Sequence, residues 1–553
     1  MSDSSGTRSG GRPAPTSLAQ QAALLPERMR RTAVPNLFVA LEISPALDAV
    51  ALDRAAVELV SRHEILRTVY PDDRRIPYQK VAPAPDSVVE IVESEDTETT
   101  ADADHRFDLV HDSPVRIRLH RSPDRDVLSI AVHPVAADDR SVELLVAELF
   151  ATYAGATVPA PAQYRTFATA ELKTLASNAS GDADLNYWLQ RLAELPERAD
   201  IAAAEPAPGA ASRYTFRVPP EAIASAGAGT PAEAVSAAVV THALSETGMA
   251  DDVAVGLTDP GRAADGAETA LGGFANQLVL RLDPTGDRTP RQLIEDAARA
   301  TAEARAHAGT RIERLTHEMR GAAAVTSGVP FQVLVNVRAE AATAPVAGHT
   351  VRELTRRIAR PYGVDILVDV VTGDGADVTV DVTPALAGHP ELDEFVRLLE
   401  RKYSEWAARP DDPARRREDG PALFTRTTLP PPGTTGLGGA PRSDEERMLA
   451  DAIRQVLDLD EDDEVGRADT FFSLGGDSIA ALRLATLLGE QGYALEVQTV
   501  FEFPAIHELA EQLVPADPEA AATDTAAPTV APMGASGLDQ DALQALGRKF
   551  AAQ

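Results

Sequence analysis

The apolar positions in the last quarter of the chain recur at the spacing of amphipathic helices. They form three consecutive runs: Leu449, Ile453 and Val456; Ala480, Leu484, Leu487 and Leu488; and Val500, Phe501, Ile506, Leu509 and Leu513. Each run gives a helix one apolar face, and such faces are buried by packing against one another. The pattern therefore predicts a small all-α bundle over residues 443–514.

The longer region upstream mixes strand and helix patterns. Leu37 to Ile43 predicts a strand, and the spacing of Leu52, Ala55, Ala56, Leu59 and Val60 predicts a helix after it. Val127 to Val132 predicts a buried strand with His133 at its end, and another helix follows shortly afterwards. Catalytic groups are commonly displayed on loops between a strand and a helix, so His133 is a candidate site residue.

Four segments have the composition of leaders, linkers or tails rather than of packed elements. Residues 1–15 predict a disordered leader, and the Pro- and Gly-rich residues 408–442 predict a linker. An Ala/Pro/Thr-rich stretch predicts a second linker at 515–536. Residues 537–553 are amphipathic and predict either a docking helix that folds on a partner or a frayed terminus.

Length, charge and cysteine content narrow the class of protein. A chain of 553 residues has room for about three to four domains. Its 85 acidic and 52 basic residues argue against nucleic acid and anionic membranes as partners. Residues 443–514 hold 17 acidic and 4 basic residues, which favours partners with basic surfaces.

The chain contains no cysteine, which excludes disulfides, thiolate metal sites and a cysteine nucleophile. This composition fits a cytoplasmic protein. The sequence has no apolar run of about 18 residues and no apolar secretion signal at its start, so we expect neither a membrane span nor export.

One string in the predicted bundle carries chemistry, the sequence Leu474-Gly475-Gly476-Asp477-Ser478-Ile479. The two glycines allow a sharp backbone turn, and Asp477 and Ser478 favour the start of a helix. The N-terminal end of a helix dipole tolerates a phosphate, so Ser478 suits a phosphodiester. The alternative is a serine that only caps the helix.

With this string, residues 443–514 resemble a peptidyl carrier protein. The resemblance implies a four-helix domain with 4'-phosphopantetheine attached covalently to Ser478. It also implies a phosphopantetheinyl transferase as a partner.

Six strings further upstream occur in an order that resembles the condensation domains of nonribosomal peptide synthetases. They are T-S-L-A-Q at 16–20, R-H-E-I-L-R-T at 62–68, His133 to Asp139, Tyr187-Trp188, G-G-F-A-N-Q-L at 272–278 with Arg281, and Pro330-Phe331-Gln332. The resemblance covers residues 16–407. It implies an α/β fold like chloramphenicol acetyltransferase, with an N-lobe at 16–178, a C-lobe at 179–407 and a tunnel between them.

The central string departs from the family pattern His-His-x-x-x-Asp-Gly. Here it runs from His133 through Pro134 to Asp138 and Asp139, so proline replaces the histidine that contacts the attacking amine. Proline has no side-chain donor or acceptor and no backbone N–H, so it cannot take a proton or orient an amine. We therefore expect no catalytic residue in this domain and regard His133 and Asp138 as remnants of the motif.

The other motif residues support a maintained fold rather than maintained chemistry. Arg67 and Asp138 are retained, and the resemblance implies that the aspartate is structural and pairs with a basic residue. His63 is expected to be structural, whereas His133 is either structural or the base of a rewired site. No His/Asp/Glu set has metal-ligand spacing, so no metal is expected.

The pair Asp138-Asp139 also resembles the X domains of glycopeptide synthetases, which carry His-Arg-x-x-x-Asp-Asp. That resemblance implies a docking platform that recruits haem monooxygenases, although in that family the carrier precedes the X domain. Residues 408–442 are too few for an adenylation domain. We therefore expect a trans-acting adenylation enzyme to load Ser478.

Three hypotheses follow from these patterns. In the first, the chain is a carrier joined to an inactive scaffold that presents a thioester to neighbouring synthetase modules or tailoring enzymes. In the second, it is a working enzyme that joins two carrier-bound substrates through an amide or ester, using His133 or orientation alone. In the third, it is an architectural subunit whose carrier is unused. Whether the chain is an enzyme stays open at this point.

Overall fold

The structure, a computed structural model, describes two compact units that divide between residues 426 and 427, here called the condensation unit and the carrier unit. It describes residues 13–515 except 31–33, 75–76, 94–99, 123–124, 178–181, 194, 196–197, 203–210, 225–230, 250–251, 320–328, 341–345, 347, 362, 418–419, 426–435, 437, 458, 460–463, 472–473, 475–477, 496–498, 501–502 and 504. Most of the predicted leader, the second linker after residue 515 and the predicted docking helix therefore lie outside the described residues.

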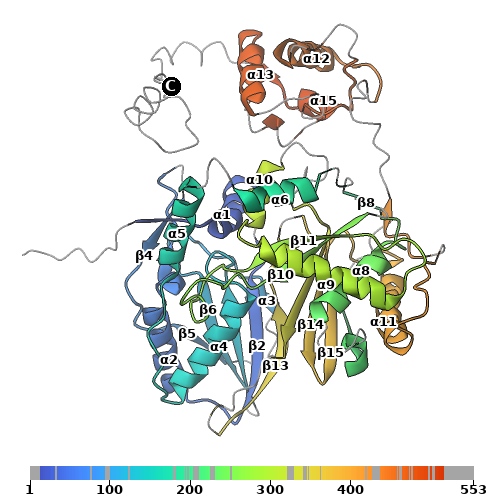
Figure 1. Ribbon diagram of the computed structural model, residues 1–553. Helices are drawn as coiled ribbons and strands as arrows, with labels where there is room; N and C mark the ends of the chain where they lie inside the picture. Colours follow the sequence, from blue (N-terminus) through green and yellow to red (C-terminus); the bar gives the residue numbers. More distant parts are fainter. Residues whose placement is uncertain are drawn as a thin grey trace, which may run out of the picture. The chain divides into compact units, whose positions relative to one another are not determined.

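The first sheet of the condensation unit has five strands in the order β13-β2-β7-β6-β5. Their bounds are β13 Thr350–Arg357, β2 Leu37–Ser44, β7 Asp126–Val132, β6 Val115–Arg121 and β5 Val89–Glu93. Helices α2 (Ala49–Arg62) and α4 (Asp139–Tyr153) pack together on one side of this sheet (Figure 1). The buried residues of α2 are the five that its apolar spacing predicts, so the expected helix face is confirmed.

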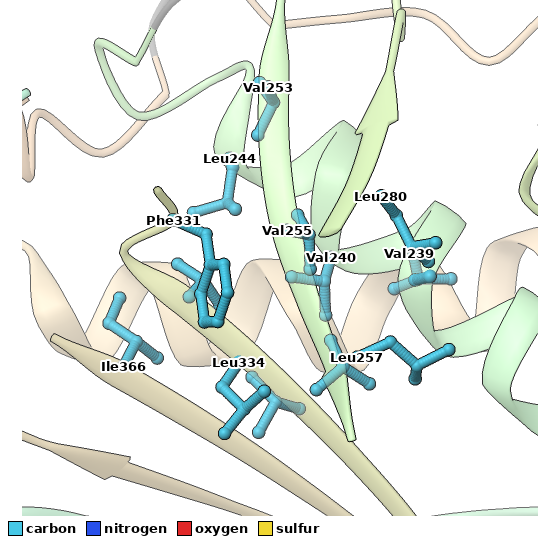
Figure 2. Packing of buried hydrophobic residues seen from close by; sticks show 14 of the residues in the cluster. Val239, Val240, Leu244, Val253, Val255, Leu257, Leu280, Phe331, Leu334 and Ile366 are labelled. Carbon is cyan, nitrogen blue, oxygen red and sulfur yellow. The ribbon is translucent and has the colours of Figure 1, made fainter. Parts of the chain in front are cut away.

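The second sheet has six strands in the order β11-β10-β12-β14-β15-β9. Their bounds are β11 Asn276–Leu282, β10 Val253–Asp259, β12 Val333–Ala339, β14 Ile366–Gly373, β15 Gly375–Val382 and β9 Arg213–Val218. Helix α8 (Ala232–Leu244) is buried from Ala234 to its end because it is apolar on every side. Figure 2 shows its Val239, Val240 and Leu244 packed with residues of β10 and with Phe331.

A glycine in β10 makes this packing possible. A Cβ on Gly256 would lie 2.3 Å from the ring of Phe331, well inside van der Waals contact. Only glycine admits the aromatic ring so close to the strand.

Strand β13 belongs to the first sheet although it follows β12 of the second sheet in the chain. The chain leaves the second sheet after Ala339, pairs β13 antiparallel with β2, and returns as β14. We call the stretch 340–365 the strand excursion. A division into lobes at residues 178 and 179 does not account for this strand, which ties the later segment into the earlier sheet.

The remaining elements of the condensation unit surround the two sheets. They are β1 Ala14–Pro15, α1 Leu18–Arg30, a 3₁₀ turn Glu64–Arg67, β3 Thr68–Val69, β4 Tyr78–Val81, α3 Thr100–Ala103, α5 Tyr164–Ser177, α6 Ala183–Arg191, β8 Asp200–Ile201, α7 Pro220–Ile223, α9 Pro290–Ala306, α10 Ile312–Glu318, α11 Leu392–Ala408 and β16 Phe424–Thr425. β1, β4 and β3 form a small sheet, which includes the end of the predicted leader.

Residues 409–425, which composition assigns to the linker, are packed onto the condensation unit where they are described. Leu423 and Phe424 are buried in its second core, and β16 pairs with β8. Ala414 donates its N–H to Arg288 and accepts a hydrogen bond from the ring of His242. Prolines end helices but do not prevent an extended segment from docking through apolar side chains, so composition alone misplaces the start of the linker.

The carrier unit contains α12 (Asp444–Leu457), α13 (Ser478–Glu490) and α15 (Ile506–Ala510), together with a short pair of strands, β17 (Tyr493–Ala494) and β18 (Val514–Pro515). One core buries Leu449, Ile453, Val456, Leu484, Leu488, Val500, Ile506 and Leu509. The predicted apolar faces therefore meet as expected. The side chains of Ala480 and Phe501 lie outside the described residues.

Candidate functional site

The motif turn, residues 133 to 139, connects the end of β7 to the start of α4. His133 stands at the end of the buried strand, with 2 % of its side chain exposed. Its Nδ1 accepts a hydrogen bond of 3.1 Å from the N–H of Val135, which places the ring proton on Nε2. Nε2 lies 3.4 Å from Oε1 of Glu27, within ion-pair distance but outside hydrogen-bond geometry.

The ring of His133 therefore faces Glu27 of helix α1 and the backbone of Val135, both of which belong to the first lobe. Burial raises the pKa of Glu27, but its contacts with His133 and the N–H of Val34 outweigh burial, so its pKa is lowered below the ordinary value. A backbone N–H occupies Nδ1, and Nε2 faces the carboxylate of Glu27 without forming a hydrogen bond. The geometry favours the structural interpretation of His133 over that of a base in a rewired site.

Pro134 follows in a half-buried turn whose backbone is held by the first predicted string. Gln20 donates from Nε2 to the carbonyl of Val135 at 3.4 Å and to the hydroxyl of Tyr70 at 3.0 Å. Ser17 is in turn hydrogen bonded to the hydroxyl of Tyr164 at 2.9 Å. The T-S-L-A-Q string therefore supports the motif turn and supplies no reactive group to it.

Asp138 is the centre of a buried hydrogen-bond hub, which we call the Asp138 hub. Its Oδ1 accepts from Nη2 of Arg262 at 2.8 Å, and from the N–H and hydroxyl of Ser141 at 2.7 and 2.6 Å. Its Oδ2 accepts from the N–H groups of Phe274 and Ala275, both at 2.9 Å. One carboxylate thus caps α4 and fastens it to the segment that carries the Gly272–Asn276 string.

The expectation that Asp138 pairs with a basic residue holds, but the residue is Arg262 rather than Arg67. The guanidinium of Arg67 donates to the carbonyls of Ala82 and Ser61 instead. Arg262 lies 124 positions from Asp138 in the chain, and no local pattern connects the two. Only the crossing of the chain between the lobes brings them together.

Asp139, the next residue, enters a different buried network. Its carboxylate lies 3.2 Å from Nη1 of Arg356 on β13 and 3.8 Å from Nε of Arg338 on β12. Arg338 also lies 3.4 Å from Asp369 on β14. Burial raises the pKa of Asp139 to about 6, against the two arginines, which lower it. The sequence shows a carboxylate at position 139, but no local pattern predicts that Arg338 and Arg356 are its partners.

The Gly272–Asn276 string joins the two lobes through its backbone and one amide. A Cβ on Gly272 would lie 1.9 Å from the ring of Tyr164, so glycine is required for this close approach. Asn276 accepts from the N–H of Ile312 at 2.9 Å and donates to the carbonyls of Ala308 and Thr310. Its amide thereby fixes the start of α10.

The later strings also meet in structural contacts. The rings of Tyr187 and His307 stack at 3.8 Å, and Nε1 of Trp188 donates to the carbonyl of His307 at 2.9 Å. Gln332 exchanges hydrogen bonds with both backbone groups of Ala199. The Nε2 of His63 contacts Glu148 at 2.9 Å, in agreement with a structural role for this histidine.

In the carrier unit, α13 begins at Ser478, as the glycine string predicts. Leu474, four residues earlier, is buried in the core with Phe471 and Leu484. Residues 475–477 and the side chain of Ser478 lie outside the described residues. A serine at the first residue of a helix has a hydroxyl placed where the helix dipole favours a phosphate, so the geometry suits the predicted phosphodiester.

The residues that the structure describes contain no cluster of three His, Cys, Asp or Glu residues arranged to hold a metal ion. None of their helices combines the length and apolar character needed to cross a membrane.

Two family profiles match the chain. The condensation domain profile matches residues 13–359, and the phosphopantetheine attachment site profile matches residues 447–513. The chain belongs to the condensation domain family, and a carrier domain of the phosphopantetheine-binding family follows the condensation domain. The second match implies 4'-phosphopantetheine as a covalent cofactor.

Two curated relatives illustrate the level of similarity. A probable non-canonical nonribosomal peptide synthetase, CymA from Salinispora arenicola, is 29% identical over 320 residues, which are 54% of this chain and 4% of the relative. The isonitrile lipopeptide synthase of Mycobacterium tuberculosis is 31% identical over 354 residues, 58% of this chain and 14% of the relative. The chain thus spans a small part of these synthetases.

Solved structures share the fold. The X-domain of teicoplanin biosynthesis in its complex with OxyB matches with a TM-score of 0.62 and 23% identity, over 73% of this chain and 95% of that one. The condensation domain of the monacolin K polyketide synthase MokA matches with a TM-score of 0.63 and 18% identity, over 73% and 99%. These matches confirm the expected two-lobed α/β fold.

Proposed function

We propose that this chain carries an aminoacyl or peptidyl thioester on 4'-phosphopantetheine attached to Ser478, and that its condensation domain forms no peptide bond. In this proposal the condensation domain is a scaffold or recruitment platform for enzymes that act on the tethered group. The observation that carries the proposal is Pro134 at the position where the family places its amine-contacting histidine.

The chemistry of Pro134 supports this proposal directly. Amide formation between two thioester-bound substrates needs a group that orients the attacking nitrogen or accepts its proton. Proline offers neither a side-chain acceptor nor a backbone donor at that point. Its neighbour His133 has its two nitrogens directed at Val135 and Glu27, so it is not placed to substitute.

The retained supports of the motif turn point in the same direction. Gln20, Asp138 and Arg262 keep the turn and the lobe crossing in place through buried hydrogen bonds. These contacts stabilise a fold and take no part in proton transfer. A scaffold would keep such contacts while it lacks the reactive residue. An enzyme that had lost its function without any other role would lose the structural and the reactive residues alike.

Similarity to the X-domain suggests what the scaffold is for. The solved X-domain from teicoplanin biosynthesis forms a complex with OxyB. By analogy, the condensation unit of this chain would recruit a tailoring enzyme, or a neighbouring synthetase module, to the group on Ser478.

Two further partners follow from the carrier. A phosphopantetheinyl transferase would attach the cofactor. An adenylation enzyme from outside these 553 residues would load it, since only the 35 residues 409–443 lie between α11 and α12. The carrier's excess of acidic residues would favour basic docking surfaces on both.

The proposal is tested by a condensation assay. Donor and acceptor carriers loaded with amino acids are incubated with and without the protein, and dipeptidyl thioester is quantified by mass spectrometry. We expect the same amount of product in both reactions. Product that forms with the wild-type protein and disappears with His133→Ala would establish the working condensation enzyme instead.

A further inference from the structure

The interior of the condensation unit contains a second charge network beside the Asp138 hub. Five charged side chains and one amide form it: Asp139 on α4, Asn336 and Arg338 on β12, Glu353 and Arg356 on β13, and Asp369 on β14. The carboxylate of Asp139 contacts both Arg338 and Arg356. Since β12 lies in the second sheet and β13 in the first, this residue links both sheets to the motif turn.

Apart from Glu353, whose side chain is 33 % exposed, the charged side chains of the network are largely withdrawn from solvent. Arg356 is 6 % exposed, Arg338 13 % and Asp139 19 %. Charged groups are rarely buried to this degree unless they are paired, because desolvation costs several kcal/mol per ion. The pairing of Asp139 with two arginines is therefore required for this packing and is not an incidental surface contact.

The two arginines lie near the ends of the strands that carry them. Arg338 is the second-last residue of β12, and Arg356 is the second-last residue of β13. Each is also held from its other side, Arg338 by Asp369 and Arg356 by Glu353 at 2.8 Å. The last residues of β12 and β13 are thus joined by arginines that meet at one carboxylate beside the motif turn.

We propose that Asp139, Arg338 and Arg356 form a clamp that holds strand β13 against the first turn of α4 and restricts access to the motif turn at Pro134. Asp139, Arg338 and Arg356 are positioning residues, and they hold the lobes in one arrangement. In the motif pattern of the family this position is glycine, which has no side chain that could make these contacts. The clamp deepens the proposed function, since it gives a second reason, independent of Pro134, why substrates would not react at this turn.

The absence of cysteine from the chain provides a direct test, because Pro134→Cys creates a unique thiol at the motif. Its rate of alkylation by iodoacetamide, and by a chloroacetamide carried on a pantetheine arm, measures access to the turn. We expect alkylation to be about tenfold faster when Asp139→Gly or Arg356→Gln is added to Pro134→Cys, because opening of a locally held segment limits the reaction.

Arg352 provides a matched control on the same strand. It pairs with Glu42, and its side chain is 63 % exposed. Arg352→Gln removes the same charge from β13 outside the clamp, so its alkylation rate should stay within about twofold of the Pro134→Cys protein. Protein unfolded in urea gives the upper limit of the rate and distinguishes clamp release from loss of the fold.

Asp139→Asn keeps the shape of the side chain and removes its charge, which covers the case in which the glycine variant fails to fold. Hydrogen exchange of residues 134–140 and 350–357 in proteins that retain Pro134 is a second measurement, with faster exchange expected in both segments for Asp139→Asn. Unchanged alkylation and exchange in folded Asp139→Asn and Arg356→Gln variants would overturn the clamp. Neither measurement uses turnover, so a failed clamp and a failed proposed function give different results.

Discussion

The motif turn of the condensation unit and the glycine string of the carrier unit differ in how their residues contribute to the fold. At the motif turn of the condensation unit, Gln20 and Arg262 hold the turn through buried hydrogen bonds, and Pro134 stands next to these contacts. In the carrier unit, the glycine string is complete and α13 begins at Ser478. The comparison teaches that the folding contacts of the motif turn come from residues other than Pro134, so the proposed loss of the reaction is compatible with a maintained fold.

Asp138 and Asp139 show the same separation at adjacent positions. Asp138 accepts hydrogen bonds from backbone N–H groups and from one arginine within the Asp138 hub, whereas Asp139 forms ion pairs with arginines of two sheets. Asp138 holds the start of α4 and the crossing segment in place, and Asp139 adds contacts that glycine at that position could not make. A substitution of Asp138 should therefore lower the free energy of unfolding. A substitution of Asp139 should change the mobility of the motif turn and the pH dependence of the free energy of unfolding.

The largest effect is expected at the carrier. Ser478→Ala should abolish the mass increment that coenzyme A and a phosphopantetheinyl transferase produce on the wild-type protein, because no other hydroxyl occupies the first residue of α13. Ser443→Ala is the matched control, since the hydroxyl of Ser443 accepts from the N–H of Glu446 at the start of α12. It should leave modification complete. Modification of the Ser478→Ala protein would show that the carrier uses another residue.

The second effect concerns the Asp138 hub. Asp138→Ala leaves the 8 % exposed Arg262 without its carboxylate, and loss of one partner of a buried pair costs about 3–5 kcal/mol. Both tryptophans, Trp188 and Trp406, lie in the condensation unit, so their fluorescence in urea follows the unfolding of that unit alone. We expect the midpoint to fall by an amount that corresponds to this loss.

The control for that measurement is an exposed ion pair of the same unit. Asp377 lies 3.4 Å from Arg217, and their side chains are 65 % and 63 % exposed. Asp377→Ala should change the free energy of unfolding by no more than about 1 kcal/mol. Equal effects of the two substitutions would remove the distinction between a structural hub and an ordinary surface aspartate.

The smallest effect is the pH dependence of Asp139. Burial raises its pKa to about 6, whereas an unfolded aspartate titrates near 4, so the native protein binds more protons between about pH 4 and 6. The free energy of unfolding contributed by this group therefore falls as pH rises through that window. Relative to Asp139→Asn, the wild-type protein should lose on the order of 1–3 kcal/mol between pH 4 and pH 7.

Other titratable groups face Asp139, and both proteins keep them. They are Glu143 on α4, Glu353 on β13 and Asp369 on β14, and the pKa of Asp369 is likewise raised by burial. Urea unfolding at a series of pH values, again followed by tryptophan fluorescence, gives the two curves to subtract. Parallel curves would show that Asp139 is not desolvated in the folded protein.

Local patterns were sufficient for much of the fold. The five buried positions of α2, the strand that delivers His133, and the apolar faces of the carrier follow from periodicity, since burial of one face imposes spacing on neighbouring residues. The glycine before α13 and the proline in the motif turn are likewise legible from the sequence, because their backbone properties are local. The resemblance to condensation domains then predicted the two-lobed α/β fold.

Contacts between distant residues could not be obtained in this way. Nothing near Asp138 indicates Arg262, and nothing near Asp139 indicates Arg338 or Arg356, because these partners are brought together by the crossing of the chain between two sheets. The burial of Leu423 and Phe424 could not be predicted for a similar reason. A Pro-rich composition indicates a segment without helices, but it does not reveal the apolar surface against which that segment packs.

The sequence by itself determined the apolar faces of the helices, the carrier string and the presence of Pro134 in the motif turn, all of which depend on residues a few positions apart. The tertiary structure decided which charges are paired and which strand joins which sheet. Asp138 and Arg262 are 124 residues apart, and Asp139 and Arg356 are 217 residues apart. These pairs form only when the folded chain brings their charges together, and folding also withdraws the charges from water, which strengthens their attraction.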